Sequence, residues 1–141
     1  MRGLLTILSC LVVSASAWGQ STYDRHILTA AVGAVPTSTV TASSTVIRGA
    51  IEELTIGLPS AGATATVSVV SQPEVGPALV LYSNAAMVAS ARVPVRMDGD
   101  GVITNIGEHY VVLVGDTVTL TVTPVSATSN VNWKAEIKVA R

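Results

Sequence analysis

Strict alternation of apolar and polar residues marks two segments near the end of the chain. In residues 117–123, Val118, Leu120 and Val122 alternate with four threonines. Residues 132–139 repeat this pattern, and residues 63–71 place small apolar residues opposite hydroxyl residues. A period of two is typical of antiparallel strands that have one buried and one solvated face. The inward residues expected in these last two segments are Trp133, Ala135, Ile137 and Val139, and Ala63, Ala65, Val67 and Val69.

Weaker patterns predict further strands. Residues 23–32 and 46–56 are rich in apolar residues, and the second segment is interrupted by Glu52 and Glu53. Residues 78–82 and 110–114 predict two short strands. The alanine-rich residues 84–91 fit either a helical turn or a strand that continues into residues 92–95.

Proline, glycine and aspartate separate these segments. They predict a polar loop over residues 36–44 and turns over residues 57–62 and 72–77. A hairpin turn is expected at Asp98–Gly101, because glycine tolerates the positive φ of such turns. A further turn is expected at Gly115 and Asp116.

Together these elements predict an all-β fold. We expect a single antiparallel β-sandwich or jelly roll of about seven to eight strands, in a domain that spans residues 18–141. No amphipathic segment of helix length separates the strands, which disfavours a doubly wound α/β fold. The last strand is expected inside the sheet, with Trp133 as the best core anchor.

The composition fits this fold and excludes one class of partner. Valine, alanine and threonine fill 57 of the 141 positions, whereas aromatic residues make up 4% and phenylalanine is absent. The core is therefore expected to consist of aliphatic side chains between thin strands. The net charge is −1 and the eight basic residues are scattered singly, so no electrostatic footprint for nucleic acid exists.

Residues 1–17 differ from the rest and have the layout of a secretory signal peptide. A cationic start precedes an apolar run over residues 4–13, and Ala15 and Ala17 occupy the −3 and −1 positions of an A-x-A cleavage site. The run has about ten residues, against about 20 needed to cross a bilayer, so no stable membrane anchor is expected. The alternative is an N-terminal element that is buried in the fold or in a partner.

Cleavage of this segment would change the chemistry of the chain. Cleavage after Ala17 leaves Trp18 as the first residue, and cleavage after Gly19 is the second option. Cys10, the only cysteine, stands in a sequence loosely similar to a lipoprotein box, but the apolar stretch before it is too short for a signal core. Without Cys10 the chain has no disulfide and no thiol nucleophile, so packing and hydrogen bonds must stabilise the fold.

Residues that carry catalytic chemistry are few. His26 and His109 are 83 positions apart and match no metal-binding spacing. The chain has no nucleophile elbow, P-loop or dinucleotide-binding motif, and no particular serine is marked as part of a Ser-His-Asp group. Glu52 and Glu53 are adjacent, so a strand would point them to opposite faces. The sequence therefore predicts no catalytic, cofactor-binding or metal-binding residue, and no cofactor.

One acidic segment has residues that could ligate calcium. Asp98, Asp100 and Asn105 offer oxygen ligands of the kind that calcium prefers. However, Val102 stands where a third ligand is expected and His109 where a bidentate glutamate is expected. A plain hairpin turn is favoured over calcium binding.

Arg92 and Arg96 form a basic pair within five residues. They flank Pro94 at an even spacing, so both would project from one face of a strand. The alternatives are a docking site for an acidic partner surface and an ordinary solvated face.

Several short motifs follow one another in a characteristic order. Residues 46–51 read V-I-R-G-A-I and precede the Thr/Val-alternating residues 64–70. Residues 92–94 (R-V-P) lead to D-G-D-G at 98–101, and G-D-T-V at 115–118 opens a further strand. Over about 120 residues this order resembles a loose group of small phage structural proteins, described as head, decoration or tail-accessory proteins. The resemblance implies a virion-associated β-sandwich whose partners are capsid or tail proteins or further copies of itself.

These observations lead to two functional hypotheses. The first is a non-enzymatic structural or accessory protein of a phage virion, which acts through protein–protein contacts and forms a homo-oligomer or joins a particle. The second is an exported bacterial β-sandwich, periplasmic or cell-surface after removal of residues 1–17, for adhesion or ligand binding. The signal-like segment favours the second, because phage virions assemble in the cytoplasm. An enzyme such as a hydrolase is disfavoured by the missing nucleophile and base motifs.

Overall fold

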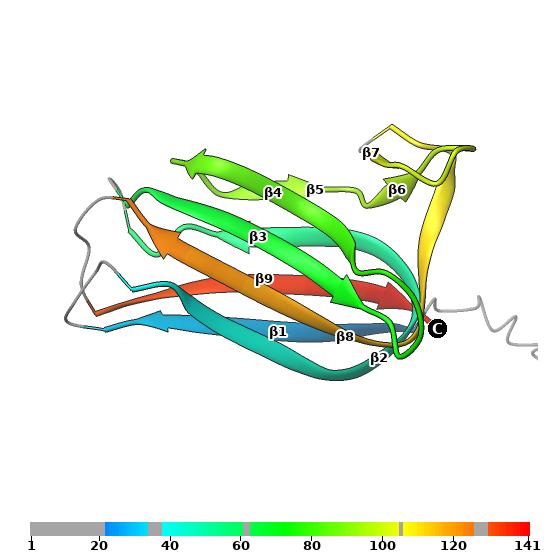
Figure 1. The fold of residues 1–141 in the computed structure, drawn as a ribbon, viewed down its shortest axis with the longest axis horizontal. Helices are drawn as coiled ribbons and strands as arrows, with labels where there is room; N and C mark the ends of the chain where they lie inside the picture. Colours follow the sequence, from blue (N-terminus) through cyan, green and yellow to red (C-terminus); the bar gives the residue numbers. More distant parts are fainter. Residues whose placement is uncertain (1–21, 34–37, 61–62, 105, 126–129) are drawn as a thin grey trace, which may run out of the picture.

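The described part of the chain is built of β-strands (Figure 1). A computed structural model describes residues 22–33, 38–60, 63–104, 106–125 and 130–141. These ranges contain nine strands and no helix. The strands are β1 (Tyr23–Val32), β2 (Val40–Gly57), β3 (Ala65–Gln72), β4 (Leu79–Met87), β5 (Ala91–Val93), β6 (Arg96–Met97), β7 (Ile103–Thr104), β8 (His109–Pro124) and β9 (Val131–Ala140).

All pairings between these strands are antiparallel, in the order β1-β9-β2-β8-β3-β4. β5 pairs with β2, and β6 pairs with both β7 and β8. The predicted antiparallel all-β fold is confirmed, and β9 lies between β1 and β2, inside the sheet as expected. The nine strands exceed the seven to eight expected because they include three very short ones, β5, β6 and β7, of two or three residues each.

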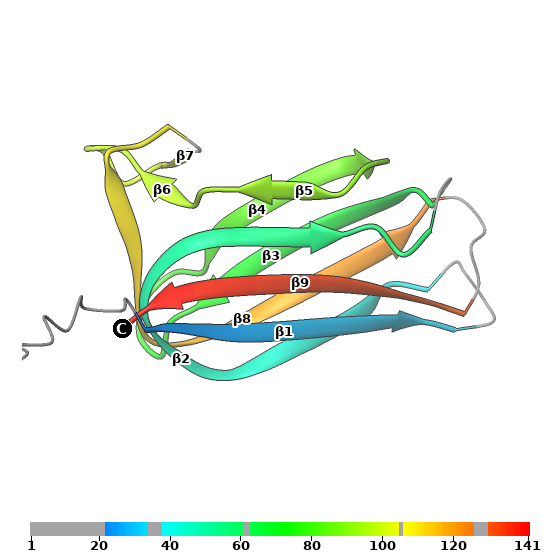
Figure 2. The same cartoon turned by 180° about the vertical axis from the view of Figure 1, so that it is seen from behind.

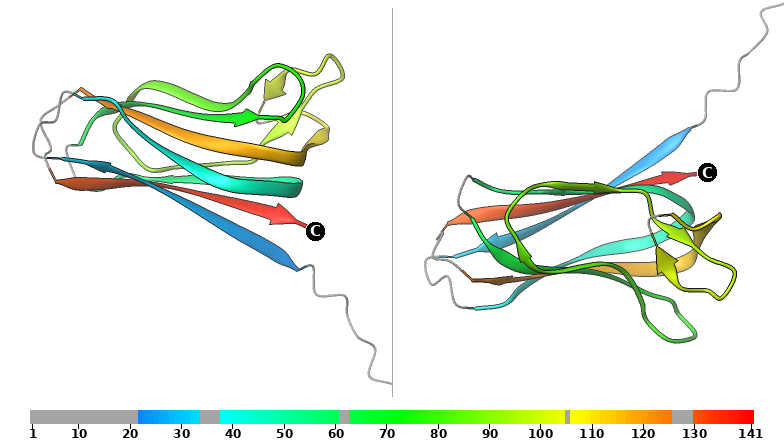
Figure 3. Two further views of the ribbon diagram at one scale, coloured as in Figure 1. Left: turned by 60° about the horizontal axis from the view of Figure 1, so that its bottom comes forward. Right: turned by 90° about the horizontal axis from the view of Figure 1, so that it is seen from above.

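β2 belongs to both layers of the sandwich. Its residues 40–51 pair with β8, whereas residues 50–57 pair with β9. One layer therefore consists of β1, β9, the second half of β2 and β5, and the other of the first half of β2, β8, β3 and β4. The right-hand view of Figure 3 shows the two layers facing each other, and Figure 2 shows β1 and β9 side by side along the molecule.

The inward residues of both layers form one aliphatic core. The alternation in the sequence is confirmed at each inward position it named, because none of those side chains is more than 1% exposed. Trp133 is the largest fully buried side chain, which confirms it as the core anchor. Full burial of a Val, Leu or Ile side chain contributes about 1.5–3 kcal/mol, so this aliphatic core is the main source of stability.

β2 reverses its inward phase where it changes layers. Ile51 is buried from an odd position, whereas Leu54 and Ile56 are buried from even positions. The register with β9 shifts between Ile51 and Glu53, which leaves Glu52 as the extra residue of a β-bulge. A bulge bends its strand and increases the local twist, and strands that switch sheets use this device at corners.

Gly49 lets the two layers meet at this corner. Its φ is +127°, and a Cβ there would overlap the carbonyl oxygen of Ala140 and approach Cγ1 of Val139 to 2.6 Å. β9 therefore lies directly against the backbone of β2. Glycine is the residue that tolerates both this φ and so close an approach.

The outer faces of the two layers differ in charge. The face of β1 and β9 carries charged pairs such as Arg25 Nε to Glu136 Oε1 at 3.2 Å. In the other layer, residues 40–47, 65–72, 79–87 and 117–124 contain no Asp, Glu, Lys or Arg. Their hydroxyl groups pair across strands, as between Ser43 Oγ and Thr119 Oγ1 at 2.9 Å. Exposed pairs of either kind contribute little to stability, so the faces differ mainly in what they can bind.

The structure corrects two sequence-based predictions and resolves an alternative. Residues 40–44, expected in a polar loop, begin β2 and add their hydroxyl groups to the uncharged face. Gly115 and Asp116, expected as a turn, lie within β8, which continues to Pro124. Residues 84–87 belong to β4, so the strand alternative holds for them. The signal-like residues 1–17, with Cys10, lie outside the described residues.

We expect Gly49→Ala to lower the free energy of unfolding by about 2–4 kcal/mol, because the added Cβ strains the backbone and pushes β9 away from β2. Urea-induced unfolding of the full chain measures this change. Gly99→Ala is the matched control, since no atom lies within 4 Å of a Cβ there, and its effect should stay within about 0.5 kcal/mol. Equal effects of the two substitutions would contradict the role assigned to Gly49.

Candidate functional site

The first half of β8 exposes an apolar strip. Tyr110 is 49% exposed, Val112 60% and Val114 78%, whereas Val111 and Leu113 between them are buried. These outward side chains stand at every second position, so they project from the same face of the strand. Three large exposed residues in a row are unusual for a face that only meets water.

Arg48 and Val46 of β2 widen this strip. Arg48 is directly opposite Val114 in the β2–β8 ladder, and opposite residues project from the same face. A Cβ at Gly115 would lie 3.7 Å from Nε of Arg48 and 3.8 Å from Cγ1 of Val46, so both side chains flank the glycine. We call the surface formed by Val46, Arg48, Tyr110, Val112 and Val114 the β8 patch.

A bulge at Gly115 determines which residues of β8 face outward. Before it, Leu113 is buried from an odd position, and after it, Val118 is buried from an even one. Ile47 and Arg48 of β2 pair with Asp116 and Val114, which leaves Gly115 as the extra residue, with a φ of +96°. The outward residues are therefore valines before the bulge and threonines after it.

Asp116 holds this bulge from the inside. It is 7% exposed, and its Oδ1 accepts a hydrogen bond from the backbone N–H of Val114 at 2.9 Å. Its Oδ2 accepts a hydrogen bond from the hydroxyl of the fully buried Ser71 at 2.6 Å. Both carboxylate oxygens have donors, as a buried carboxylate requires. The sequence prediction missed this pair, although Ser71 stands at an inward position of the alternating strand β3.

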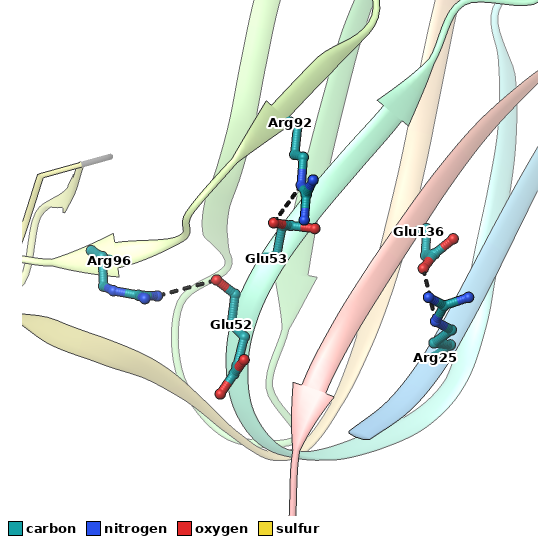
Figure 4. Close-up of polar contacts among 6 residues, drawn as sticks. All are labelled: Arg25, Glu52, Glu53, Arg92, Arg96 and Glu136. Carbon is teal, nitrogen blue, oxygen red and sulfur yellow. Dashed lines mark hydrogen bonds and ion pairs between the residues drawn. The ribbon is translucent and has the colours of Figure 1, made fainter. Parts of the chain in front are cut away.

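Arg92 and Arg96 do not share a strand, contrary to the expectation from their spacing, since they belong to β5 and β6. The Nε of Arg92 lies 2.6 Å from Oε2 of Glu53, and the hydrogen bond and charge of this carboxylate raise the pKa of Arg92. The Cζ of Arg96 lies 3.9 Å from the centroid of the Tyr110 ring, and its Nη1 donates to the carbonyl oxygen of Glu52 at 3.2 Å. Both guanidinium groups are therefore engaged within the fold (Figure 4).

Figure 4 also shows the side chains of Glu52 and Glu53 pointing apart. The expectation for this pair is met, although the β-bulge at Glu52 and not simple strand alternation sets the two directions. Glu53 forms the ion pair with Arg92, while Glu52 contributes its backbone oxygen to Arg96. The two carboxylates do not form an acid–base pair.

Arg48 differs from the other arginines in the described ranges. The rest contact a carboxylate or an aromatic ring: Arg25, Arg92, Arg96 and Arg141. Within the same ranges no carboxylate lies within ion-pair distance of Arg48, which is exposed. Arg48 lines two grooves, of about 520 and 470 Å³. The arginine without a partner in these ranges is thus part of the β8 patch.

The two histidines lie on different strands. His26 of β1 is half-buried and lines the groove of about 520 Å³ together with Asp24, whose carboxylate pairs with Nη2 of Arg141 at 2.5 Å. His109 is exposed at the start of β8, opposite Met97. Among the residues that the structure describes, no three His, Cys, Asp or Glu side chains are grouped to hold a metal ion.

The hairpin turn predicted at Asp98–Gly101 is confirmed. The N–H of Gly101 donates to the carbonyl oxygen of Asp98 at 3.1 Å. Oδ1 of Asp98 accepts from the N–H of Asp100 at 3.1 Å and from that of Val102 at 2.9 Å. This carboxylate oxygen thus stabilises the turn itself. Asn105, the third candidate calcium ligand, lies outside the described residues.

Comparison with protein-family models, curated proteins and solved structures finds no match to this chain. In the described ranges no helix is long and apolar enough to cross a membrane. The role of the β8 patch is therefore inferred from its own chemistry. An exposed tyrosine, exposed aliphatic side chains and an arginine without a partner suit the binding of another protein, because aromatic residues and arginine are enriched at protein interfaces.

We expect Ser71→Ala and Asp116→Ala each to lower the free energy of unfolding by about 1–3 kcal/mol, because each leaves a buried polar group without its partner. In the double variant the loss should fall short of the sum by about 1 kcal/mol, which a double-mutant cycle in urea measures. Ser68→Ala, on the outer face of the same strand, is the control and should change little. Additive effects of the two inward substitutions would refute a coupled pair.

Proposed function

We propose that this protein is a non-enzymatic structural or accessory component that acts through protein–protein contacts. The observation that carries the proposal is the β8 patch, in which three exposed valines and a tyrosine adjoin the free Arg48. Contiguous exposed apolar residues with a polar rim mark interaction sites on soluble proteins. The remaining arginines of the described ranges are engaged in contacts within the chain, which leaves this surface as the best candidate for binding.

Within this class we propose a virion-associated role, as a head, decoration or tail-accessory protein of a phage. The order of motifs from Tyr23 onward supports this setting through its resemblance to such proteins. An antiparallel sandwich also suits the role, because its rigid faces present side chains at fixed spacings to a neighbouring protein.

The second candidate is an exported β-sandwich that binds its partner in the periplasm or at the cell surface. The layout of residues 1–17 favours this candidate, since a cationic start, an apolar run and the A-x-A site together form an export signal. The β8 patch would serve adhesion or ligand binding in that setting. The two candidates differ in where the native protein resides and in its first residue.

We expect the native protein to co-sediment with density-gradient-purified phage particles and to yield peptides there by mass spectrometry. Recovery in the periplasmic or surface fraction alone, with Trp18 as the first residue by N-terminal sequencing, would instead establish the exported candidate.

The same fractionation tests the β8 patch. Val114→Asp should reduce incorporation into particles at least about tenfold, because a carboxylate replaces an apolar contact while the side chain, 78% exposed, is not needed by the core. Thr121→Asp on the uncharged face is the control. Unchanged incorporation of the Val114→Asp variant would exclude the patch as the contact surface.

A further inference from the structure

A groove of about 520 Å³ is formed where the start of β1 approaches the corner of β2. The described residues that line it are Asp24, His26, Val46, Arg48, Gly49 and Arg141. The start of β1 and the end of the chain lie at the same end of the molecule (Figure 2), where Tyr23 pairs with Ala140. Side chains from three separate parts of the chain therefore meet in one groove. Its volume is within the range of about 300–1,000 Å³ that is usual for small-molecule sites.

The inward face of β1 changes from apolar to polar at this groove. Leu28, Ala30 and Val32 occupy inward positions, and none of them is more than 3% exposed. β1 pairs with β9 without a register shift, so Asp24 and His26 belong to the same face of the strand. Both are half-buried. Partly buried polar groups need polar partners, so this end of the interior suits a polar ligand.

Cationic side chains outnumber anionic ones among the described residues that line the groove. Arg48 and Arg141 each contribute a guanidinium group and His26 an imidazole, whereas Asp24 contributes the one carboxylate side chain of this set. Oδ2 of Asp24 lies 2.5 Å from both Nε and Nη2 of Arg141, which holds this guanidinium at the groove. The charge of Arg48 has no carboxylate within ion-pair distance in the described ranges, so it is available to a ligand.

The second groove that Arg48 lines has a different charge balance. Among the described residues around that groove of about 470 Å³, Arg48 and Glu74 are the charged ones, and Gln72 and Thr117 are polar and neutral. One carboxylate thus stands against one guanidinium. An anion that reaches Arg48 is therefore attracted more strongly to the groove at the start of β1.

We propose that the groove lined by His26, Arg48 and Arg141 binds an oxyanion, the carboxylate or phosphate group of a small molecule. Guanidinium groups bind both kinds of oxyanion through paired N–H donors, and an imidazole supplies an N–H donor in either protonation state. The contact with Asp24 uses two nitrogens of Arg141, which leaves the remaining N–H groups of this guanidinium for a ligand. The site goes beyond the proposed contact role, because a small anion occupies it without a protein partner.

The experiment is an NMR titration of the isotope-labelled full chain with inorganic phosphate and, in a second series, with citrate. Sodium chloride at the same ionic strength is the reference, because it screens exposed charges equally. We expect saturable shifts of the backbone amides of residues 24–26 and 48–49 with at least one of the two probes. The probe that saturates at the lower concentration identifies the preferred group, phosphate or carboxylate.

Variants of the lining residues test the assignment. Arg48→Ala should raise the dissociation constant at least about tenfold and His26→Ala at least about threefold, because each removes a hydrogen-bond donor to the anion. Asp24→Asn should lower it at least about threefold, since it removes the opposing charge and keeps an oxygen for Arg141. Arg25→Ala is the matched control, because this arginine lies on the outer face of β1 and pairs with Glu136. It should leave binding unchanged.

Each outcome decides the proposal. Shifts that do not saturate, or that chloride reproduces, would overturn it, and so would a control as disruptive as Arg48→Ala or weaker binding by the Asp24→Asn variant. Circular dichroism and urea unfolding separate lost binding from lost folding, and the gain expected for Asp24→Asn cannot result from unfolding. Failure here would leave the contact role in place, because Val114, which tests that role, is not among the residues that line the groove.

Discussion

The two layers of the sandwich are joined by the backbone of one strand at one corner. β2 must pair with β8 in one layer and with β9 in the other within 18 residues. Gly49 permits this because the carbonyl of Ala140 occupies the space of its missing side chain. The extra residue Glu52 then resets the phase, so that Leu54 and Ile56 again point into the core. A side chain at Gly49 or a regular ladder at Glu52 would separate the layers or expose the core.

Closure of the corner by backbone contact has a consequence for the surface. At Gly49, β2 and β9 are in contact through main-chain atoms. The side chain of the neighbouring Arg48 does not pack between the layers and is exposed. The bulge at Gly115 opposite it likewise carries no side chain, and Asp116 fastens that bulge from within. Two glycines thus leave room around the guanidinium of Arg48, where the layers join.

The alternating strands of this fold can be predicted from the sequence, whereas its bulges and the start of β2 cannot. Residues 117–123 and Trp133 follow from period two, because one face of each strand meets water and the other meets the core. Residues 40–44 looked like a loop because the serines and threonines of an uncharged sheet face have the composition of a loop. Gly115 and Asp116 looked like a turn because bulges and turns use the same residues. The phase reversal between Leu113 and Val118 is the signal that separates the two cases.

The candidate site shows the same limit for charged residues. Spacing alone singled out Arg92 and Arg96 as a basic pair, yet the partner of Arg92 is Glu53, on a strand distant in sequence. No pattern in the sequence distinguishes Arg48, which is an isolated arginine in an apolar strand. It becomes a candidate binding residue only in the structure, where nearby Asp116 and Asp24 bind Ser71 and Arg141 instead. Long-range pairing decides which charges remain free, and period and spacing carry no information about it.

The outward valines of β8 support the proposal that this surface binds another protein. After the bulge, the outward positions of β8 are threonines, which have a β-propensity similar to that of valine and remain hydrated. Before the bulge, the same face carries Tyr110, Val112 and Val114, none of which contributes to the core. A strand that met only solvent along its whole length would gain nothing from this change in composition. If a second molecule covered these positions, as proposed, valine would be favoured over threonine there, because the contact would remove more apolar surface from water.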